Sequence, residues 1–323
     1  MATNEKVTFN RLITDKAEGL MEDTKDFVAM RAFGIATVTK RMGEYPVFKI
    51  EDLYRNSLRK RAVGSQYAET GTDIEMKSFV CADYGVEEPI AFETMEEMGG
   101  EQYKQQIADK LMIDAYRNYE QVVIDFAFTS GNWSTVLAGG ATTDLANNQF
   151  AYFNIGTNNI PELFRKLKEK AHALCGRKPN TLLLTSDVMD TLLENAFIRD
   201  MIAMTRDQII DEAFLAKVLG LKNIYVTDAI VNDANLGAKD MKHMHSKTAL
   251  LYWDGEAGRN SITAPCAMKV VRLNYGDTNS ASGVGIYERE DEARDVQILR
   301  VKQRFVPVVQ YSEAGILLTN CIQ

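Results

Sequence analysis

Residues 101–129 read EQYKQQIADKLMIDAYRNYEQVVIDFAFT, the longest helical pattern in the chain. Its apolar and aromatic side chains recur every three or four residues, which predicts one amphipathic helix. No Gly or Pro interrupts the pattern, and Ser130-Gly131-Asn132 supplies residues that end helices. At ~1.5 Å per residue the helix would be on the order of 40 Å long, the length of a strut. The apolar stripe consists of Tyr103, Ile107, Leu111, Ala115, Tyr119, Val122, Val123 and Phe126.

The polar side chains of the same stretch predict a surface that faces solvent or a partner. A long surface helix of an ordinary α/β enzyme would show this pattern too, so the helix alone leaves both structures open. The polar positions are Gln102, Lys104, Gln105, Asp109, Lys110, Asp114, Arg117 and Glu120.

The composition is that of a globular protein. The chain has 323 residues, of which 46% are hydrophobic and 25% charged. Its net charge of −8 argues against a general nucleic-acid binder. The four cysteines have no C-x-x-C spacing, so we expect reduced thiols in a cytoplasm. Residues 1–10 are polar and the apolar runs are short, so we expect neither a signal peptide nor a membrane span.

Residues 44–90 have extended ends, a basic middle and hardly any apolar pattern. Such a stretch cannot bury a core of its own, so we interpret it as an excursion that packs on another chain or as a mobile lid. Its charges could also be an ordinary solvated face. Residues 87–101, which follow, are acidic and would give a nearby basic loop something to bind. The basic residues are Arg55, Arg59, Lys60 and Arg61, four charges within seven positions.

The rest of the chain shows two further patterns. Residues 130–159 have Asp144 as their only charged residue and look like a linker or insertion. From residue 160 to residue 253, helical segments alternate with short apolar strands, which predicts an α/β unit.

Residues 296–310 alternate strictly between apolar and polar positions, which predicts a strand roughly 50 Å long at ~3.3 Å per residue. A long strand and a long helix of similar reach suggest a plate in which one packs along the other. We expect the cations of the polar face, Arg300, Lys302 and Arg304, to meet acidic side chains of the helix or of an adjacent subunit rather than DNA.

We find no catalytic or cofactor motif. Gly283-Val284-Gly285 lacks the third glycine of a dinucleotide loop, and no Walker or Gly-x-Ser-x-Gly pattern occurs. His243 and His245 could share a metal, but a surface loop explains them better. Helix capping explains Ser186-Asp187. We therefore expect no catalytic residue, no cofactor and no metal.

Three segments, taken together, resemble the major capsid proteins of tailed bacteriophages. Residues 48–55 (FKIEDLYR), followed by 60–64 (KRAVG), are similar to the family's extended loop, although Val63 stands where Pro is common. Residues 176–184 (GRKPNTLLL) resemble the axial domain. Residues 296–310 resemble the long closing strand, and the three segments keep the family's order.

The resemblance implies an α+β fold of the Hong Kong 97 type, with an N-terminal arm, an extended β-hairpin loop, a peripheral domain and an α/β axial domain. The peripheral domain would hold the spine helix, at 101–129, and long β-strands. The implied boundaries are 1–43 for the arm, 44–90 for the loop, 91–150 for the first peripheral segment, 151–264 for the axial domain, 265–310 for the second peripheral segment with the closing strand, and 311–323 for a C-terminal return to the axial domain.

The resemblance also implies a structural protein rather than an enzyme. Copies would assemble into hexamers and pentamers in the host cytoplasm and form the icosahedral shell of a virion. The shell would enclose double-stranded DNA without sequence-specific binding and without a membrane. A portal is an expected partner, and so is a separate scaffold protein, because only residues 1–43 precede the loop.

Two alternatives remain from the sequence. An encapsulin shares the fold but encloses cargo enzymes. A soluble α/β enzyme would use residues 160–253 as its sheet domain and the basic loop as a lid over an anionic substrate.

If subunits tile edge to edge, we expect the basic loop to dock across the boundary on an acidic surface of the neighbour. The expected interface residues are Arg55, Arg59, Lys60, Arg61, Glu96, Glu97, Glu288, Glu290, Asp291 and Glu292.

Overall fold

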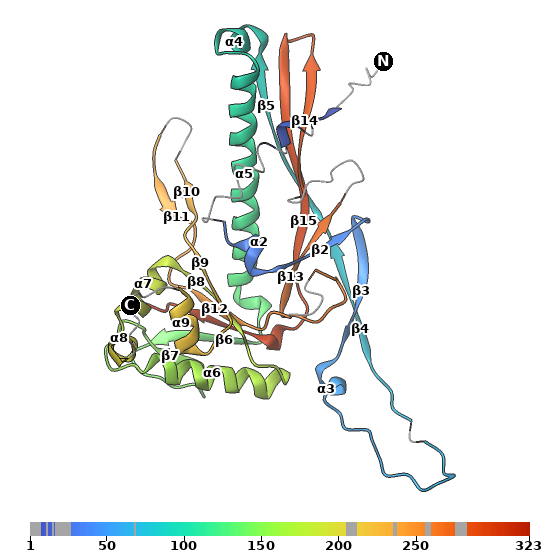
Figure 1. Ribbon diagram of the computed structural model, residues 1–323, viewed down its shortest axis with the longest axis vertical. Coiled ribbons are helices and arrows are strands. Elements are labelled where there is room, and N and C mark those ends of the chain that lie inside the picture. The colour runs from blue at the N-terminus through green and yellow to red at the C-terminus, as the bar shows by residue number, and fades with distance from the viewer. Residues whose placement is uncertain are drawn as a thin grey trace.

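The computed structural model describes residues 8–10, 12–14, 16, 27–67, 69–204, 212–234, 238–255, 260–274 and 283–323. Figure 1 shows an elongated molecule in which a long helix and a tall sheet stand side by side. A unit of helices and strands lies at the foot of the helix, and a loop projects away from the body on the other side.

The predicted long helix is α5 (Glu101–Phe128), which ends one residue earlier than expected. Its last turn is tied down by Trp133, whose Nε1 donates to the carbonyl of Ala127 at 2.7 Å. The sequence placed Lys104 and Glu120 on the polar surface, but both are buried, because the packed face of the helix is wider than the apolar stripe. The buried face consists of Lys104, Ile107, Ala108, Leu111, Met112, Ala115, Tyr116, Tyr119, Glu120, Val123, Ile124 and Ala127.

The tall sheet is built around β15 (Val296–Val309), the long strand predicted at 296–310. β5 (Ala82–Ala91) pairs with one edge, while β14 (Val284–Asp291) and β13 (Met268–Leu273) share the other, all antiparallel to β15. Leu299 and Val301 pack in one core with Leu111 and Met112 of α5, so the strand does pack along the helix. Two N-terminal strands complete the sheet, β1 (Thr8–Phe9) beside β14 and β2 (Gly34–Val38) beside β13.

The projecting loop begins and ends in a two-stranded hairpin of β3 (Met42–Phe48) and β4 (Ile74–Val80). One turn of helix, α3 (Ile50–Leu53), follows β3, and residues 54–73 form neither helix nor strand where they are described. The sequence placed the end of the loop at residue 90. The hairpin closes instead at Val80, and the residues after it form β5, because their backbone pairs with β15 in the tall sheet.

The unit at the foot of α5 is an α/β layer structure. Residues 130–159, expected to be a linker, contain η1 (Ser130–Asn132) and contribute two strands to its sheet. The strand order is β7 (Gln149–Ala151), β6 (Thr135–Gly140), β16 (Gly315–Thr319), β12 (Ala249–Tyr252), β8 (Thr181–Thr185) and β9 (Asn223–Thr227). The helices are α6 (Ile160–Cys175), α7 (Ser186–Glu194), α8 (Ala196–Met204) and α9 (Glu212–Leu219).

Alternation along these strands separates two cores. Leu182 and Leu184 of β8 pack under α6, α7 and α9, whereas Leu183 points to the opposite face, toward α5. Two short pieces complete the unit. β10 (Ile230–Asn232) and β11 (Met241–His243) form a separate hairpin, and η2 (Ser312–Ala314) joins β15 to β16.

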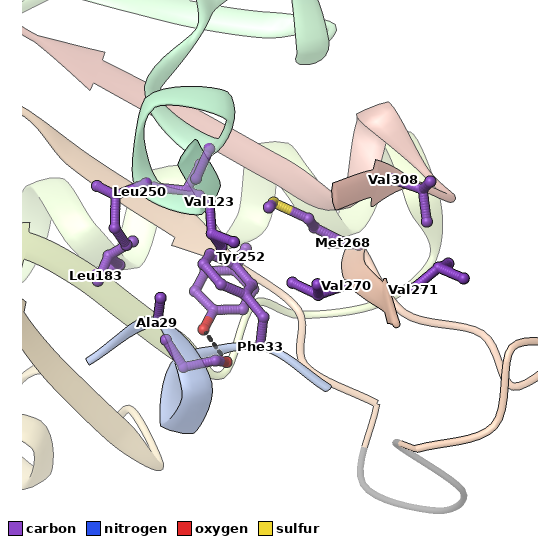
Figure 2. Close-up of a cluster of buried hydrophobic side chains, with 14 of the residues drawn as sticks. Ala29, Phe33, Val123, Leu183, Leu250, Tyr252, Met268, Val270, Val271 and Val308 are labelled. Carbon is purple, nitrogen blue, oxygen red and sulfur yellow. Dashed lines mark hydrogen bonds between the residues drawn. The ribbon is translucent and has the colours of Figure 1, made fainter. Parts of the chain in front are cut away.

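The core between the sheets joins the two halves of the molecule (Figure 2). Phe33, which follows α2 (Ala29–Ala32), lies against Tyr252 of β12 with ring centroids 5.2 Å apart. The Tyr252 hydroxyl donates to the carbonyl of Ala32 at 2.6 Å. Residues 28–33 therefore lie between α5 and the foot unit.

Candidate assembly surfaces

The two acidic segments, far apart in the sequence, lie at one end of the molecule. α4 (Phe92–Glu97) touches the turn between β14 and β15, where the Phe92 N–H donates to the carbonyl of Asp295 at 3.3 Å. Both are at the top of Figure 1. We call this surface the acidic pole, and its exposed carboxylates belong to Glu93, Glu96, Glu97, Glu101, Glu290, Glu292 and Asp295.

Two of the predicted interface carboxylates are held more closely. Glu288 is bound inside its own subunit, with Oε1 3.0 Å from Nζ of buried Lys104 and 2.6 Å from Nδ2 of Asn10. Asp291 is half-buried and has the Arg294 guanidinium 3.7 Å away. The Glu288 contacts fix the N-terminal segment to the tall sheet, so this carboxylate is less available to a neighbour than Glu290 or Glu292.

The four predicted basic residues lie on the projecting loop, and all are exposed. Arg59 and Lys60 form no ion pair with a described residue, and Arg55 is 3.8 Å from Asp52. Arg61 donates to the carbonyl of Ser65 at 2.8 Å and stacks over the Tyr67 ring, 3.9 Å from its centroid. The loop tip, residues 55–67, thus presents its charges to the outside at the end opposite the acidic pole (Figure 1).

Apolar side chains on the loop tip are exposed as well. Leu58 is 94% exposed, Val63 104% and Tyr67 75%. The root of the loop, by contrast, is anchored. The Tyr54 hydroxyl donates to the carbonyl of Gly176 at 3.1 Å, and Tyr311 donates to the carbonyl of Phe48 at 3.0 Å. A fixed root and an uncovered tip are the geometry of an arm that reaches a second molecule.

No protein-family model matches the sequence, and neither does any curated protein. Solved structures do match. A phage-related protein from Bordetella bronchiseptica RB50 is similar with a TM-score of 0.72 at 14% identity over 98% of both chains. The capsid of Cyanophage P-SCSP1u is similar with a TM-score of 0.52 at 12% identity, over 89% of this chain and 86% of that one. The chain has the Hong Kong 97-type capsid fold.

The same fold relates the chain to shells of another kind. The encapsulin in the holo-SrpI complex from Synechococcus elongatus PCC 7942 is similar with a TM-score of 0.50 at 11% identity, over 90% of this chain and 86% of that one. In the vocabulary of the capsid fold, α5 is the spine helix and the foot unit is the axial domain. The projecting hairpin and its tip form the extended loop.

The cations of the closing strand find their partners inside the subunit. Arg304 Nη2 lies 2.8 Å from Asp83, and Arg300 pairs with Glu87, so both carboxylates come from the adjacent strand β5. Lys302 Nζ lies 5.4 Å from the centroid of the Tyr287 ring on β14. We expected these cations to meet carboxylates of the spine helix or of an adjacent subunit. The expectation is wrong for the two arginines, because the antiparallel register places Glu87 and Asp83 of β5 directly opposite them.

The spine carries a buried acid that we missed in the sequence. Glu120 is fully buried, and its carboxylate accepts the backbone N–H of Ala29 at 2.7 Å and the Thr227 hydroxyl at 3.4 Å. Burial raises the pKa of the Glu120 carboxyl to about 7, against the opposing effect of these hydrogen bonds. Glu120 thus connects the N-terminal segment, the spine helix and the axial domain. The available signal was its position, because Glu120 lies next to Tyr119 and three residues before Val123 of the apolar stripe.

The two histidines occupy different environments. His243 is exposed with Nδ1 3.2 Å from Asp228. The His245 side chain is only 8% exposed, and its Nδ1 lies 3.5 Å from Asp125 of the spine helix. Burial lowers the pKa of His245, and the Asp125 charge opposes this effect.

The described part of the capsid fold contains no group of three or more His, Cys, Asp or Glu side chains arranged to hold a metal. Within it, no helix is both long enough and apolar enough to cross a bilayer. The four cysteines are free and buried. Ser186 and Asp187, expected to cap the helix, are instead its first two residues, and the N-cap is Thr185, whose side chain makes no capping hydrogen bond. The Asp187 carboxylate accepts the N–H groups of Val188, at 2.8 Å, and Lys247, at 2.7 Å.

Proposed function

We propose that this chain is the major capsid protein of a tailed bacteriophage. Copies assemble into hexamers and pentamers, and these form an icosahedral shell around double-stranded DNA. One observation carries the proposal beyond the fold: the extended loop is anchored at its root, while its basic and apolar tip is not covered by any described residue of the subunit. A tip of this kind gains stability only when a second molecule buries it.

The domains follow from this proposal. The N-terminal arm is 1–43 and the axial domain is 151–264. The extended loop, expected at 44–90, is the β3–β4 hairpin with its tip and ends at Val80. The peripheral domain comprises β5, the spine helix and 265–310. β6 and β7 overlap the peripheral segment expected at 91–150 but pair in the axial sheet. Residues 311–323 return to the axial domain, to whose sheet they contribute β16.

Opposite charges at the two ends of the subunit set its contact with the neighbour. The loop tip of one copy, through Arg55, Arg59, Lys60 and Arg61, docks on the acidic pole of the next copy. Each exposed ion pair contributes only ~0.2–1 kcal/mol, but the contact repeats around every capsomer and fixes its register. A contact between two different surfaces of identical chains closes into rings when the rotation allows it.

The shell encloses DNA without binding it tightly, because a chain with a net charge of −8 does not attract phosphate groups overall. The role is structural rather than enzymatic, with a portal and a separate scaffold as further partners. Assembly takes place in the host cytoplasm, and the finished protein resides in the virion.

An encapsulin-like shell is the second candidate, and the similarity to the Synechococcus encapsulin favours it as a specific observation. The contents of natively isolated shells separate the two. Double-stranded DNA supports the phage head, and packaged enzyme in place of nucleic acid supports the encapsulin.

Electron microscopy of the purified protein tests assembly itself. Closed shells or capsomers are expected, whereas small single particles at every concentration would refute the proposal. Deleting residues 57–72 from the loop should leave a folded subunit that closes no shells. Normal shells from this deletion would show that the loop tip is not the contact.

Charge reversal tests the proposed partners. Arg59→Glu with Arg61→Glu should block assembly, and adding Glu96→Arg with Glu97→Arg on the acidic pole should restore it in part. A matched control, Lys40→Glu with Lys239→Glu, makes the same change in net charge at two exposed sites elsewhere and should assemble normally. Unchanged assembly of the loop variant at physiological salt would refute the docking contact.

A further inference from the structure

A cavity opens where three parts of the fold meet. Its volume is about 620 Å³, within the roughly 300–1,000 Å³ of pockets that hold small molecules. One wall comes from α2 and β2, a second from β13 of the tall sheet and a third from β9 of the axial domain. Figure 1 shows α2 and β2 between the axial domain and the tall sheet. Small-molecule pockets favour such junctions between domains, and the described residues that line this one include none from the loop tip or the acidic pole.

Two arginines line the cavity from different elements. β2 and β13 are parallel, and their register places Arg272 beside Thr37, with both side chains on the cavity face. Arg31 comes from the last turn of α2, just before this strand. Arginine keeps its charge throughout the accessible pH range and binds phosphate through a planar fork of N–H donors. None of the described lining residues is acidic, so the polar wall suits an anion.

The Arg272 side chain is held in position by a glycine. Gly283 lies just before β14 with a φ of +71°, and a Cβ there would lie 2.3 Å from Cδ of Arg272. Glycine alone combines this backbone conformation with so close an approach. Arg272 is also half-buried, so its guanidinium is oriented before a ligand arrives, and less conformational entropy is lost on binding.

The groups on which the two arginines act do not cancel the positive charge of the cavity. Burial raises the pKa of the Glu120 carboxyl to about 7, and the Arg31 charge is a smaller, opposing effect. Near neutral pH this carboxyl is therefore only partly ionised, and it neutralises the guanidinium only in part. Arg272 acts on the Tyr119 hydroxyl, whose pKa burial raises, so that this group stays neutral.

The remaining wall of the cavity is flat and apolar. Phe33 is buried against Tyr252, which holds its ring in place (Figure 2). Tyr225 of β9 is half-buried and points to the same side of the axial sheet as Leu183, its register partner. Ile35 adds an aliphatic surface on the cavity face of β2. Aromatic side chains of this kind offer a stacking surface to a flat heteroaromatic ring.

We propose that this cavity binds a mononucleotide, a phosphomonoester that carries a flat heteroaromatic ring. Arg31 and Arg272 hold the phosphate, and the ring packs against Tyr225. Thr37 and Asn260, both exposed, offer a hydroxyl and an amide to the sugar and the base. The inference goes beyond the proposed function, because the site lies within one subunit and needs no assembly. A bound nucleotide would connect the axial domain to the tall sheet.

Equilibrium dialysis of the full chain with deoxyadenosine monophosphate tests the site. Deoxyadenosine and inorganic phosphate are the matched probes, because each carries only one half of the ligand. We expect the nucleotide to bind at least about tenfold more tightly than either half, since the charged wall and the flat wall act together. Equally tight binding of either half would overturn the inference, and so would the absence of nucleotide binding at millimolar concentration.

Two variants each remove one half of the site. Arg31→Gln, at an exposed position, should weaken nucleotide binding roughly tenfold by removing charge-assisted hydrogen bonds, and should leave deoxyadenosine binding unchanged. Tyr225→Leu should weaken nucleotide binding but leave phosphate binding unchanged. Arg165→Gln removes a guanidinium from an exposed site on α6 and is the matched control. Circular dichroism checks the fold, and parental nucleotide affinity in Arg31→Gln would overturn the inference.

Thermal unfolding gives a second measurement. The nucleotide should raise the unfolding temperature of the parent as its concentration increases, because it binds the folded state, and the rise should be smaller for Arg31→Gln. Equal rises in the two proteins would contradict the proposed site.

A single-stranded oligonucleotide without a terminal phosphate distinguishes a free nucleotide from a nucleic-acid strand. If the oligonucleotide competes more strongly than the mononucleotide, the cavity is a nucleic-acid contact and the inference is overturned. Electron microscopy scores shell formation separately. Failure of the nucleotide site therefore leaves the capsid function standing, and a parent that binds nucleotide without forming shells fails only the proposed function.

Discussion

Replacing Glu120 by glutamine tests whether the buried carboxylate couples the stability of the subunit to pH. Its oxygens accept the N–H of Ala29 and the hydroxyl of Thr227 in the core between the spine helix and the axial domain. Arg31 and Tyr119 are the other titratable groups that interact with it. Glutamine keeps the size and the accepting oxygen of the side chain but cannot ionise.

The expected magnitude follows from the pKa difference between the folded and unfolded states. An ordinary glutamate has a pKa of 4.5, whereas burial raises the pKa of Glu120 to about 7. Between these values the folded state keeps a proton that the unfolded state has released, so stability falls as pH rises through this window. The displacement corresponds to roughly 3 kcal/mol of lost stability once the pH exceeds the folded pKa.

Urea unfolding of dilute subunits at about pH 5 and about pH 8 measures this difference. We expect Glu120→Gln to have nearly the stability of the parent at the lower pH. At the higher pH it should be more stable by ~1–3 kcal/mol, since the neutral acceptor makes somewhat weaker hydrogen bonds than a carboxylate. Asp114→Asn, on the open side of the same helix beside Arg117, makes the matching change outside the core.

The result would contradict the reasoning in either of two cases. Equal losses of stability by the parent and Glu120→Gln between the two pH values would show that another group causes the loss. A Glu120→Gln variant less stable than the parent at the higher pH would show that hydrogen bonds favour the ionised carboxylate more than burial penalises it.

Three further predictions concern stability, each measurable by chemical or thermal unfolding. Phe305→Ala should lower the free energy of unfolding by ~3–5 kcal/mol, because the ring is buried against Tyr84 and Tyr119. Arg304→Ala should lower it by less than ~1 kcal/mol, because the ion pair with Asp83 is partly exposed, and equal losses in the two variants would contradict this reasoning. Gly176→Ala should lower the free energy of unfolding by at least ~1–2 kcal/mol, since φ is +66° and the new Cβ would lie 2.3 Å from the Tyr54 ring. Adding Tyr54→Ala should relieve only the steric clash, and full recovery of stability would rule out backbone strain. Trp133→Phe should cost ~1–3 kcal/mol by leaving the Ala127 carbonyl without its donor at the end of the spine helix, and an unchanged unfolding midpoint would show that this bond is dispensable.

The sequence by itself determined the elements whose signal is local. The spacing of apolar residues from Tyr103 to Phe126 predicts the spine helix, because a helical period is complete within every two turns. Strict alternation from residue 296 to residue 310 predicts the closing strand for the same reason. The sequence also predicts that the basic residues of the extended loop lie on a segment without a core of its own, because a missing apolar pattern can be recognised within that segment alone. Three short resemblances, in the right order, then identified the fold.

What only the tertiary structure decided depends on residues that are far apart in the chain. β5 was read as part of the loop because its exposed, largely polar side chains carry no apolar signal, and its strand character comes from pairing with β15. Arg300 and Arg304 form ion pairs with Glu87 and Asp83 because the register of that strand pairing places them opposite each other. The burial of Lys104 and Glu120 reflects what covers the spine helix. The two acidic segments form one pole because the end of β14 returns to the start of α4. Local periodicity specifies which elements form, but their partners, and hence the surfaces of the subunit, are set by long-range packing that a one-dimensional pattern does not contain.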